Sequence, residues 1–515
     1  MKRYIYIFVP LIGLLLGGIA GFVSFSMAAA LVVAAIAAIF IFKNYERSIY
    51  VLAFYAFIDY ILRDLLKIQL LAGYWDELLL IVCFGLWIYK GIINAGIRRE
   101  GTGKASGDIL KAGDEQDGKT EDTGFRMSPI DAPMLFFYGV FMVLLFVNSP
   151  EMKLGLEGFR AIIQHTLWFF VAMQLLRSFK GAKNVLYILL AIGTLIGLHG
   201  IYQFIIRVPI PPNWQDVAED PVPTRVFSIL KSPNILGSFM VLIAPLSLAF
   251  AANSRSFLKK LIYLGSFGVM SACLLFTYTR VAWFAYIAAL GIYFLIRDKR
   301  LILILAVTAV LMYLFVPSIN SRISYLLSPQ YIISSLSGGR LIRWIQGIGI
   351  FRENLLYGVG LGRFGGAVAM NNKMPGTFYM DNYYLKTAVE GGLAGLSAFL
   401  ILVLNVVVWG IRAIFKLSRE SDKEKFNFAV SIFAGLAGVL VHNLVENVFE
   451  VPMMTAYFWL MAAILLFIAR TAGFGLPACE MSKARDDEEE AVSAAKDAKA
   501  DVNAEDPAAN YDCTA

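Results

Sequence analysis

The chain has 515 residues, of which 58% are hydrophobic and only 16% are charged. An average soluble protein carries about a quarter charged residues, so this composition excludes an ordinary soluble enzyme. Runs such as IYIFVPLIGLLLGGIAGFV and LILILAVTAVLMYLFV reach the roughly 20 residues that a helix needs to cross a bilayer. The sequence therefore predicts an all-α polytopic membrane protein, with membrane lipids and no nucleic acid among its partners.

Taken in chain order, the apolar runs predict about fourteen transmembrane helices. These runs begin near Ile5, Met27, Tyr50, Glu77, Pro133, Arg160, Val185, Asn234, Leu261, Val281, Leu301, Gly392, Phe426 and Met454. A second run follows the first within a few residues and no small-residue cleavage site stands out. The first run is therefore predicted to be a helix and not a cleaved signal.

The polar connectors alternate in their content of Lys and Arg. Short basic connectors such as KNYER, RSFKGAK and RDKR are expected to remain in the cytoplasm, and both termini then lie there too. The predicted organisation has N-terminal transmembrane helices (1–94), a polar cytoplasmic loop (95–132), a transmembrane core with an outer loop at 207–232 (133–316), a large helical extracytoplasmic loop (317–383), C-terminal transmembrane helices (384–470) and a disordered cytoplasmic tail (471–515).

The large loop carries arginines on the side of the membrane where basic residues are disfavoured. In GGRLIRWIQGIGIFRE, Arg340 and Arg343 lie about 60° apart on a helical wheel, opposite a face that includes Trp344. Such a helix could lie on the bilayer with its arginines at lipid phosphates. Alternatively, the planar guanidinium groups grip a phosphate-containing substrate.

Three more arginines are predicted at the same outer mouth of the helix bundle. Arg280 begins one span in FTYTRVAWF, Arg160 begins another, and Arg225 lies in the first outer loop. An ionisable residue inside a span is costly without a partner, so it is a functional candidate by default. We therefore expect all three to lie level with Arg340.

The loop ends at Asp381-Asn382, just before the chain re-enters the membrane. Asp381 either caps the following helix or accepts a proton from an attacking hydroxyl group. Further along the chain, His442 stands one helical turn before Glu446, and a hydrogen-bonded pair is expected there.

Three glycines of the loop formally match a dinucleotide-binding pattern, Gly360, Gly362 and Gly365. No strand precedes them, so a Rossmann site is excluded. Either their backbone N–H groups bind an anion, or they permit close approach of the chain.

With these residues described, the chain resembles the O-antigen ligase/polymerase superfamily. The matching segments are RVFSILKSPNILG, TYTRVAWF, GGRLIRWIQGIGIFRENLLYGVGLGRFGG and DNYYLKTAVEGGLAGL, from Arg225 to Leu396. The resemblance implies a membrane glycosyltransferase of the C type. Such an enzyme uses a sugar chain on undecaprenyl diphosphate at the outer face of the cytoplasmic membrane, with neither metal nor other cofactor.

The resemblance also implies roles for individual residues. Arg280 and Arg340 match arginines that hold the diphosphate, and with Asp381 they form the predicted catalytic set. The predicted substrate-binding residues are Arg160, Arg225, Arg343, Trp344 and Asn382. Ligases carry a His-Asn pair where this chain has Asp381-Asn382, which favours a polysaccharide polymerase over an O-antigen ligase that transfers the glycan to a lipid or protein.

Two other classes of protein were weighed against this interpretation. A flippase for lipid-linked sugars would be expected to have inverted repeats and polar residues at the bilayer midplane, and the sequence has no convincing repeat. A non-catalytic assembly scaffold would not need arginines on both the loop and the spans. A polymerase would work beside a flippase and a chain-length regulator of the same pathway.

The predicted sidedness can be tested with single introduced cysteines. Cysteines at positions 104 and 495 should be protected from an impermeant thiol reagent in intact cells, whereas Asn372→Cys should react, because the large loop faces outward. Labelling of position 104 from outside would invert the predicted topology.

Overall fold

The structure is a computed structural model that describes residue 41 and residues 44–101, 126–211, 222–418 and 422–474. Every regular element in these ranges is a helix, which confirms the predicted all-α class. The helices are α3 (Arg47–Ala53), α4 (Tyr55–Tyr60), η1 (Ile61–Leu65), α5 (Gln69–Gly101), α6 (Asp131–Val147), α7 (Met152–Ile163), η2 (Gln164–Leu167), α8 (Trp168–Leu175), α9 (Phe179–Ile205), η4 (Ser228–Leu230), α10 (Pro233–Asn253), α11 (Phe257–Phe276), α12 (Arg280–Arg297), α13 (Arg300–Phe315), α14 (Pro317–Leu326), α15 (Pro329–Leu336), α16 (Arg340–Glu353), α17 (Ala367–Asn371), α18 (Tyr383–Ser418), α19 (Lys423–His442), η5 (Val448–Glu450) and α20 (Pro452–Arg470).

Eight helices in the described ranges are long and apolar enough to cross a membrane, or nine if one bent pair counts as a span. The eight are α5, α9, α10, α11, α12, α18, α19 and α20. Each coincides with a predicted apolar run, so a multi-pass membrane protein is confirmed, whereas the count of fourteen is not. The predicted spans near Ile5 and Met27 lie outside the described residues.

The other four predicted spans are short, bent or broken. Helix α6 has 17 residues, and the run beginning near Arg160 is divided among α7, η2 and α8. The run beginning near Leu301 becomes α13 and α14, which meet at an angle of 95°. Pro317 directly follows this bend. Proline has no N–H to continue the hydrogen bonds of the preceding helix, and it disfavours a helical conformation in the residue before it.

The run beginning near Tyr50 is broken between α3 and α4, at Phe54. The hydroxyl group of Tyr457, from α20, donates to the carbonyl of Ala53 (2.8 Å) and accepts from the N–H of Ala56 (3.1 Å). A broken helix inside a membrane protein is tolerated where a neighbouring helix satisfies the freed backbone groups. Hydropathy cannot reveal such a break, because the residues around it remain apolar.

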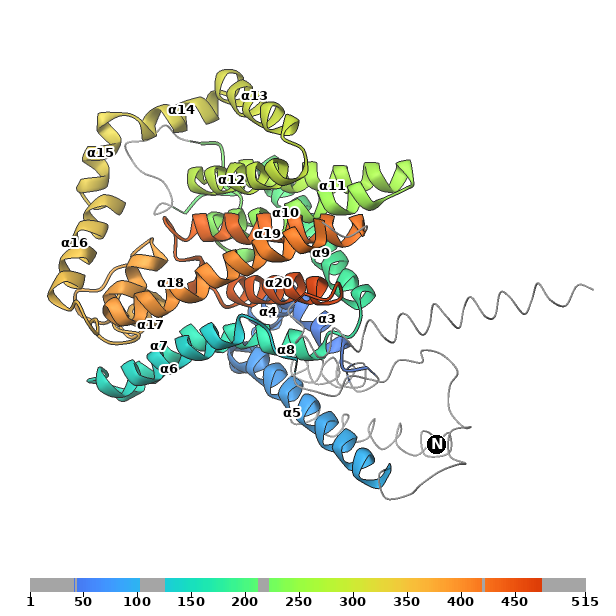
Figure 1. Cartoon of the computed structure of the whole chain (residues 1–515). Coiled ribbons are helices and arrows are strands. Elements are labelled where there is room, and N and C mark those ends of the chain that lie inside the picture. The colour runs from blue at the N-terminus through green and yellow to red at the C-terminus, as the bar shows by residue number, and fades with distance from the viewer. Residues whose placement is uncertain (1–40, 42–43, 102–125, 212–221, 419–421, 475–515) are drawn as a thin grey trace, which may run out of the picture.

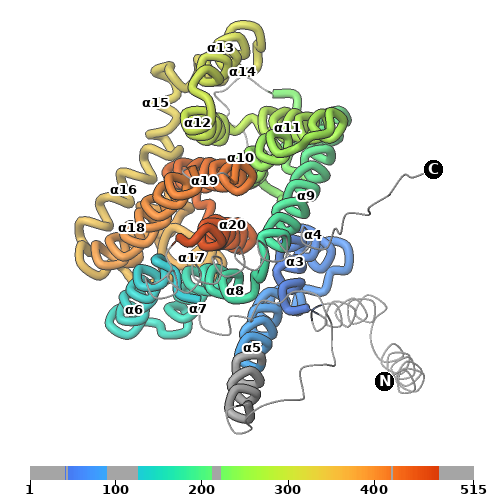
Figure 2. The backbone as a smooth tube through the Cα atoms, turned by 45° about the vertical axis from the view of Figure 1, so that its right-hand side comes forward, coloured from blue at the N-terminus to red at the C-terminus, as the bar shows by residue number. Residues whose placement is uncertain are grey.

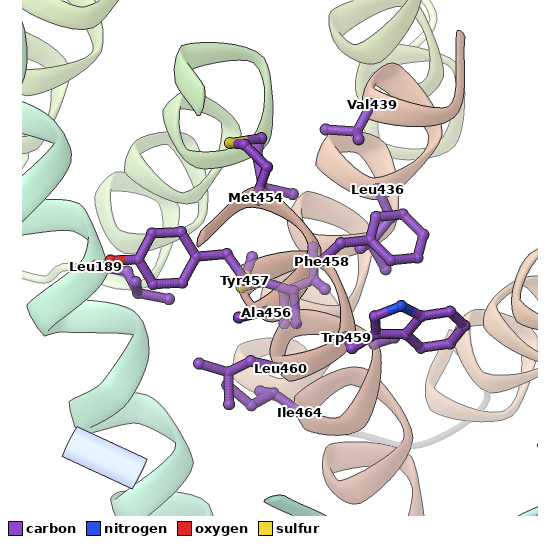
Figure 3. Packing of buried hydrophobic residues seen from close by; sticks show 14 of the residues in the cluster. Leu189, Leu436, Val439, Met454, Ala456, Tyr457, Phe458, Trp459, Leu460 and Ile464 are labelled. Atoms are coloured by element: carbon purple, nitrogen blue, oxygen red, sulfur yellow. The ribbon is translucent and has the colours of Figure 1, made fainter. Parts of the chain in front are cut away.

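Helix α20 lies at the centre of the bundle, and 94% of its most apolar window is buried. Figure 3 shows its large side chains, among them Tyr457, Phe458 and Trp459, packed among residues of neighbouring helices. Beside it, α10 and α19 approach closely, because a Cβ at Gly435 or Gly438 would collide with α10. Small residues at helix contacts of this kind are typical of membrane bundles.

Helices α13 to α16 form an arc along one side of this bundle (Figures 1 and 2). No residue of α13 is buried, whereas α16 returns to pack against the beginning of α18 (Figure 1). The large loop predicted at 317–383 is therefore helical, as expected, and it is folded back onto the bundle. The arc brings α14 and the start of α16 close to the first residues of α12.

A buried ionic cluster fixes the chain where α18 begins. The amino group of Lys386 lies 2.9 Å from a carboxylate oxygen of Glu390 and 2.5 Å from one of Glu450. These carboxylates also accept the N–H groups of Phe364 (3.2 Å) and Ala367 (2.7 Å), respectively. The cluster thus joins three parts of the chain: the glycine-rich segment (residues 358–366), α18 and the segment after α19.

Lys386→Met should strongly destabilise the protein, because it leaves two buried carboxylates without their cation. We expect the free energy of unfolding to fall by about 3–5 kcal/mol. Lys260→Met, on an exposed position of α11, is the matched control and should have little effect. Thermal unfolding of the detergent-solubilised variants measures the difference, and equal stability of the two would contradict a structural role for the cluster.

Candidate active site

A cavity of about 580 Å³, which we call the arginine cavity, opens between the arc and the bundle. It is lined by the first residues of α10 and α12, by α14, by the turn between α15 and α16, and by the segment before α18. The charged lining residues are Arg225, Arg280, Arg322, Arg340, Arg343 and Asp381. Five guanidinium groups against one carboxylate make the cavity suited to a multiply charged anion.

Two of these arginines are held by α12 and α14. The Nη1 of Arg280 donates to the carbonyl of Arg322 (3.2 Å), and its guanidinium lies over the rings of Tyr325 and Tyr331 at 5.7 and 5.5 Å. Arg322 is buried, and its Nη1 donates to the carbonyl of Tyr278 (2.8 Å). Backbone carbonyls and aromatic faces stabilise a cation without neutralising its charge.

Arg225 reaches the same cavity from the loop before α10. Its Nε donates to the carbonyl of Thr277 (3.2 Å), and its Nη2 donates to the hydroxyl oxygen of Thr279 (3.2 Å). The same nitrogen lies 3.5 Å from Oδ1 of Asn234. These contacts come from the end of α11, the residue before α12 and the start of α10.

Arg340 and Arg343 face the cavity from the first turn of α16. The Nη1 of Arg343 donates to Asp381 (2.9 Å), and the Nε of Arg340 lies 3.7 Å from the same carboxylate oxygen. Nη2 of Arg340 lies 3.5 Å from Oε2 of Glu446. Both arginines thus line the cavity and contact acidic side chains.

The backbone of Asp381 has a positive φ of 50°, which non-glycine residues seldom adopt. It is fixed from both sides. The N–H of Met380 donates to the carbonyl of Gly365 (3.1 Å), and the N–H of Asn382 donates to Oδ1 of Asn447 (3.0 Å). These two hydrogen bonds fix the backbone so that the carboxylate points toward the two arginines of α16.

Asn382, and not Asp381, caps α18. Its Oδ1 accepts the N–H of Leu385 at 2.9 Å, and the helix begins at Tyr383. The alternative in which Asp381 is the cap is thus wrong. Asn382 and Trp344 do not line the cavity. Trp344 donates its indole N–H to the carbonyl of Met380 (3.1 Å) and so ties α16 to the segment that carries Asp381.

Arg160 is the one predicted arginine that lies outside this group. It forms an ion pair with Glu77 of α5, its Nε donates to Gln164 (2.9 Å), and it lies over the ring of Tyr74 at 5.3 Å. It does not line the cavity. The structure therefore brings together Arg225, Arg280, Arg340, Arg343 and Asp381, and leaves Arg160 with a different set of partners.

Three residues at the site were not predicted: Arg322, Asn234 and Glu446. Arg322 lies in the large loop, where the sequence does not distinguish it from other basic residues. Asn234 stands in an apolar run, where a single amide has no distinguishing pattern. Glu446 was expected to pair with His442, but it accepts instead from Nδ2 of Asn234 and contacts Arg340, while His442 Nδ1 lies 2.5 Å from the Ser238 hydroxyl.

Glu446 is buried, and burial raises the pKa of its carboxyl group to about 7. The neighbouring Arg340 acts in the opposite direction, and Asp381 adds to the rise. A side chain with this pKa changes its protonation state within the physiological range.

The glycines of the glycine-rich segment allow its backbone to lie directly against the backbone of α18. A Cβ at Gly358 would collide with the backbone at Glu390. The N–H groups of Val359 and Gly360 donate to the carbonyls of Val389 (2.9 Å) and Glu390 (3.1 Å). No glycine of this segment lines the arginine cavity, so the anion-binding alternative gains no support.

A second cavity, of about 530 Å³, lies between α11, α12, α13 and α14. Its lining is almost entirely apolar and includes Leu275, Trp283, Phe284, Ile319 and Ile323. Trp283 lies less than one turn beyond Arg280 along α12, and Ile323 directly follows Arg322 on α14. The same two helices therefore border both the arginine cavity and the apolar cavity.

The fold and the site define a multi-pass membrane protein with a basic cavity formed by a helical loop folded onto its bundle. Residues 265–400 match the family model described as O-antigen ligase. The match confirms, for this region, the resemblance to the O-antigen ligase/polymerase superfamily, and it supports an enzyme of glycosyl transfer at the level of the family. No curated protein sequence matches the chain.

The matched region runs from within α11 to within α18. It includes Arg280, the arginines of α16 and the Asp381-Asn382 pair. Arg225 lies before the match, and Glu446 lies after it.

Proposed function

We propose that this protein polymerises oligosaccharide units carried on undecaprenyl diphosphate, by metal-independent, inverting glycosyl transfer at the outer face of the cytoplasmic membrane. The observation that carries the proposal is the convergence of five arginines on one cavity, next to a single lining carboxylate. A diphosphate diester carries two negative charges and several oxygen acceptors. Guanidinium groups bind such oxygens in pairs, which fits this lining.

The chemistry needs stabilisation of a leaving group. The oxygen of an acceptor hydroxyl group attacks the anomeric carbon, and the bond from that carbon to the diphosphate oxygen breaks. The electron pair of that bond remains on the diphosphate, where negative charge develops. Arginines already fixed by carbonyls and aromatic rings, as Arg280 and Arg322 are, stabilise this charge without reorganisation.

The proton of the attacking hydroxyl group needs an acceptor, and Asp381 is the only carboxylate among the residues that line the cavity in the described structure. In the structure it contacts Arg343 and Arg340. A bound diphosphate would compete for these guanidinium groups and thereby release the carboxylate. Asp381 would then accept the hydroxyl proton as a general base.

The apolar cavity supports a lipid-linked donor. It is lined, as the arginine cavity is, by residues of α12 and α14, so an anionic head and a hydrocarbon tail of one donor would each meet a matching surface on these two helices. In the topology that we propose, both termini are cytoplasmic and the arc lies outside. The donor would then be supplied by a flippase, and a chain-length regulator could act on the product.

An O-antigen ligase is the second candidate, because the family description names that activity. The polymerase is favoured by the Asp381-Asn382 pair, which stands where the resemblance implies His-Asn in ligases. A flippase is less consistent with ionisable residues gathered around one cavity beside the arc. Analysis of lipid-linked sugars after gene deletion separates these functions, since polymerase loss should leave single repeat units on the carrier at the outer leaflet.

Arg280→Ala and Arg340→Ala should each lower polymer synthesis by at least the roughly 10²–10³-fold expected for loss of a donor to a developing anion. Arg340→Lys should recover little, because an ammonium group lacks the planar pair of donors. Arg352→Ala, at an exposed position in the last turn of α16, is the matched control and should remain active. Polymer is measured on gels from cells that carry each variant at equal abundance in the membrane. An active Arg340→Ala variant would refute the proposal that Arg340 binds the diphosphate.

Asp381→Asn should lower turnover by about 10²–10⁴-fold if the carboxylate is the general base. Asparagine tolerates the positive φ and has a side chain of the same size, so the hydrogen bonds of Met380 and Asn382 that fix the backbone should persist. Asp381→His is a useful companion, since imidazole can also accept a proton and should retain part of the activity. Long polymer chains made by Asp381→Asn would show that the arginines act without this base.

A further inference from the structure

Glu446 lies behind the wall of the arginine cavity, in the segment between α19 and η5. It is buried, with 7% of its surface exposed. One oxygen, Oε2, accepts from Nδ2 of Asn234 and lies 3.5 Å from Nη2 of Arg340. Asn234 and Arg340 both line the cavity, whereas Glu446 does not.

These contacts make Glu446 the centre of a continuous polar chain that links three of the cavity arginines. On one side the chain runs through Asn234, whose Oδ1 lies 3.5 Å from Nη2 of Arg225. On the other side it runs through Arg340 to Asp381 (3.7 Å) and from there to Arg343 (2.9 Å). A change in the charge of Glu446 would thus act directly on Arg340 and, through one amide, on Arg225.

The charged and titratable groups that face Glu446 come from two elements. Arg340 lies on α16, and Asp381 and Tyr379 lie on the segment before α18. His442, at the end of α19, contacts Ser238 instead. Burial raises the pKa of the Tyr379 hydroxyl, so this side chain remains neutral. Arg340 is the cation in contact with Glu446, and it is also one of the groups that would hold the diphosphate.

We propose that Glu446 is a positioning residue for Arg340, and that it takes up a proton when the diphosphate of the donor binds. The inference rests on the proposed function, because it assigns the anion to the arginine cavity. Before the donor binds, the ionised Glu446 accepts from Asn234 and holds the Arg340 side chain by its charge. When Arg340 turns its donors to the diphosphate, the buried carboxylate loses part of its counter-charge and faces an added anion, so it is protonated from solvent.

The direction of the effect follows from the charges. Burial already raises the pKa of Glu446 to about 7, against the opposing effect of Arg340. Sharing Arg340 with an anion raises this pKa further, so at pH 7.5 the bound state holds more protons than the free state. Binding of the diphosphate should therefore tighten as the pH falls through 7, by linkage.

The experiment counts protons during binding of an inert ligand. The ligand is a diphosphate esterified at both ends, with a short isoprenoid on one phosphate and a non-transferable sugar analogue on the other. Its phosphates do not titrate near neutral pH, so any proton taken up belongs to the protein. Isothermal titration calorimetry in two buffers of different ionisation enthalpy gives the number of protons.

For the unmodified protein at pH 7.5 we expect uptake of about half a proton or more, and affinity that rises about three- to tenfold from pH 8.5 to 6.5. Glu446→Gln keeps an oxygen that accepts from Asn234 but cannot titrate, so it should bind with a flat pH profile and no uptake. Glu446→Asp should retain part of the uptake. Glu151→Gln, which alters an exposed ion pair with Arg363, is the matched control and should behave as the unmodified protein does.

The outcomes separate this inference from the proposed function. Binding without proton uptake by the unmodified protein, or unchanged uptake in Glu446→Gln, would overturn the role of Glu446 alone. Absence of any binding by the unmodified protein would overturn the diphosphate site as well. A purely structural Glu446 would alter stability in Glu446→Gln but would leave the proton count unchanged.

Discussion

A guanidinium group withdrawn from water is stable only beside groups that replace its hydration, and this constraint explains how the arginine cavity is built. Arg280 and Arg322 obtain carbonyl oxygens and aromatic faces from Tyr278 before α12, from α14 and from α15. Arg340 and Arg343 obtain carboxylates. The carboxylates offset the charge of the arginines that they contact. Under the proposed function, a bound diphosphate would compete with these carboxylates for the guanidinium groups.

The support for these side chains comes from elements far apart in the sequence. The carboxylate of Asp381 is directed by Gly365 and by Asn447, and both of their segments are tied to α18 through the cluster around Lys386. The glycine-rich segment therefore contributes to the site without lining the cavity. Its glycines allow the chain to pass against α18 so closely that backbone groups pair directly. This packing turns a long loop into a fixed wall of the cavity.

Hydropathy and charge were enough to predict the class of fold and most of the spans, because both depend on residue type along one helix. They could not predict the break at Phe54, which depends on a distant partner, the Tyr457 hydroxyl. The bend before Pro317 has a local signal in the proline itself, but hydropathy does not register it. For the site, arginine in the outer loops and at the outer end of a span was enough to select Arg225, Arg280 and Arg340, which line one cavity. The same signal selected Arg160, which does not line it, since sidedness indicates depth in the membrane but not position around the bundle. Glu446 and Asn234 needed the packing of α10 against the segment after α19.

The backbone at Asp381 bears on the difference between polymerases and ligases. Among non-glycine residues, Asp, Asn and His are those that adopt a positive φ most readily. The backbone here is held at φ 50° by the hydrogen bonds of the neighbouring residues. This position can therefore carry a carboxylate or an imidazole without movement of the chain. The exchange would instead change the charge beside Arg343, because Asp381 offsets that guanidinium and a neutral imidazole would not. A site with histidine would present more positive charge to its donor before binding, whereas under the proposed function this site would expose part of that charge only when the diphosphate displaced Asp381.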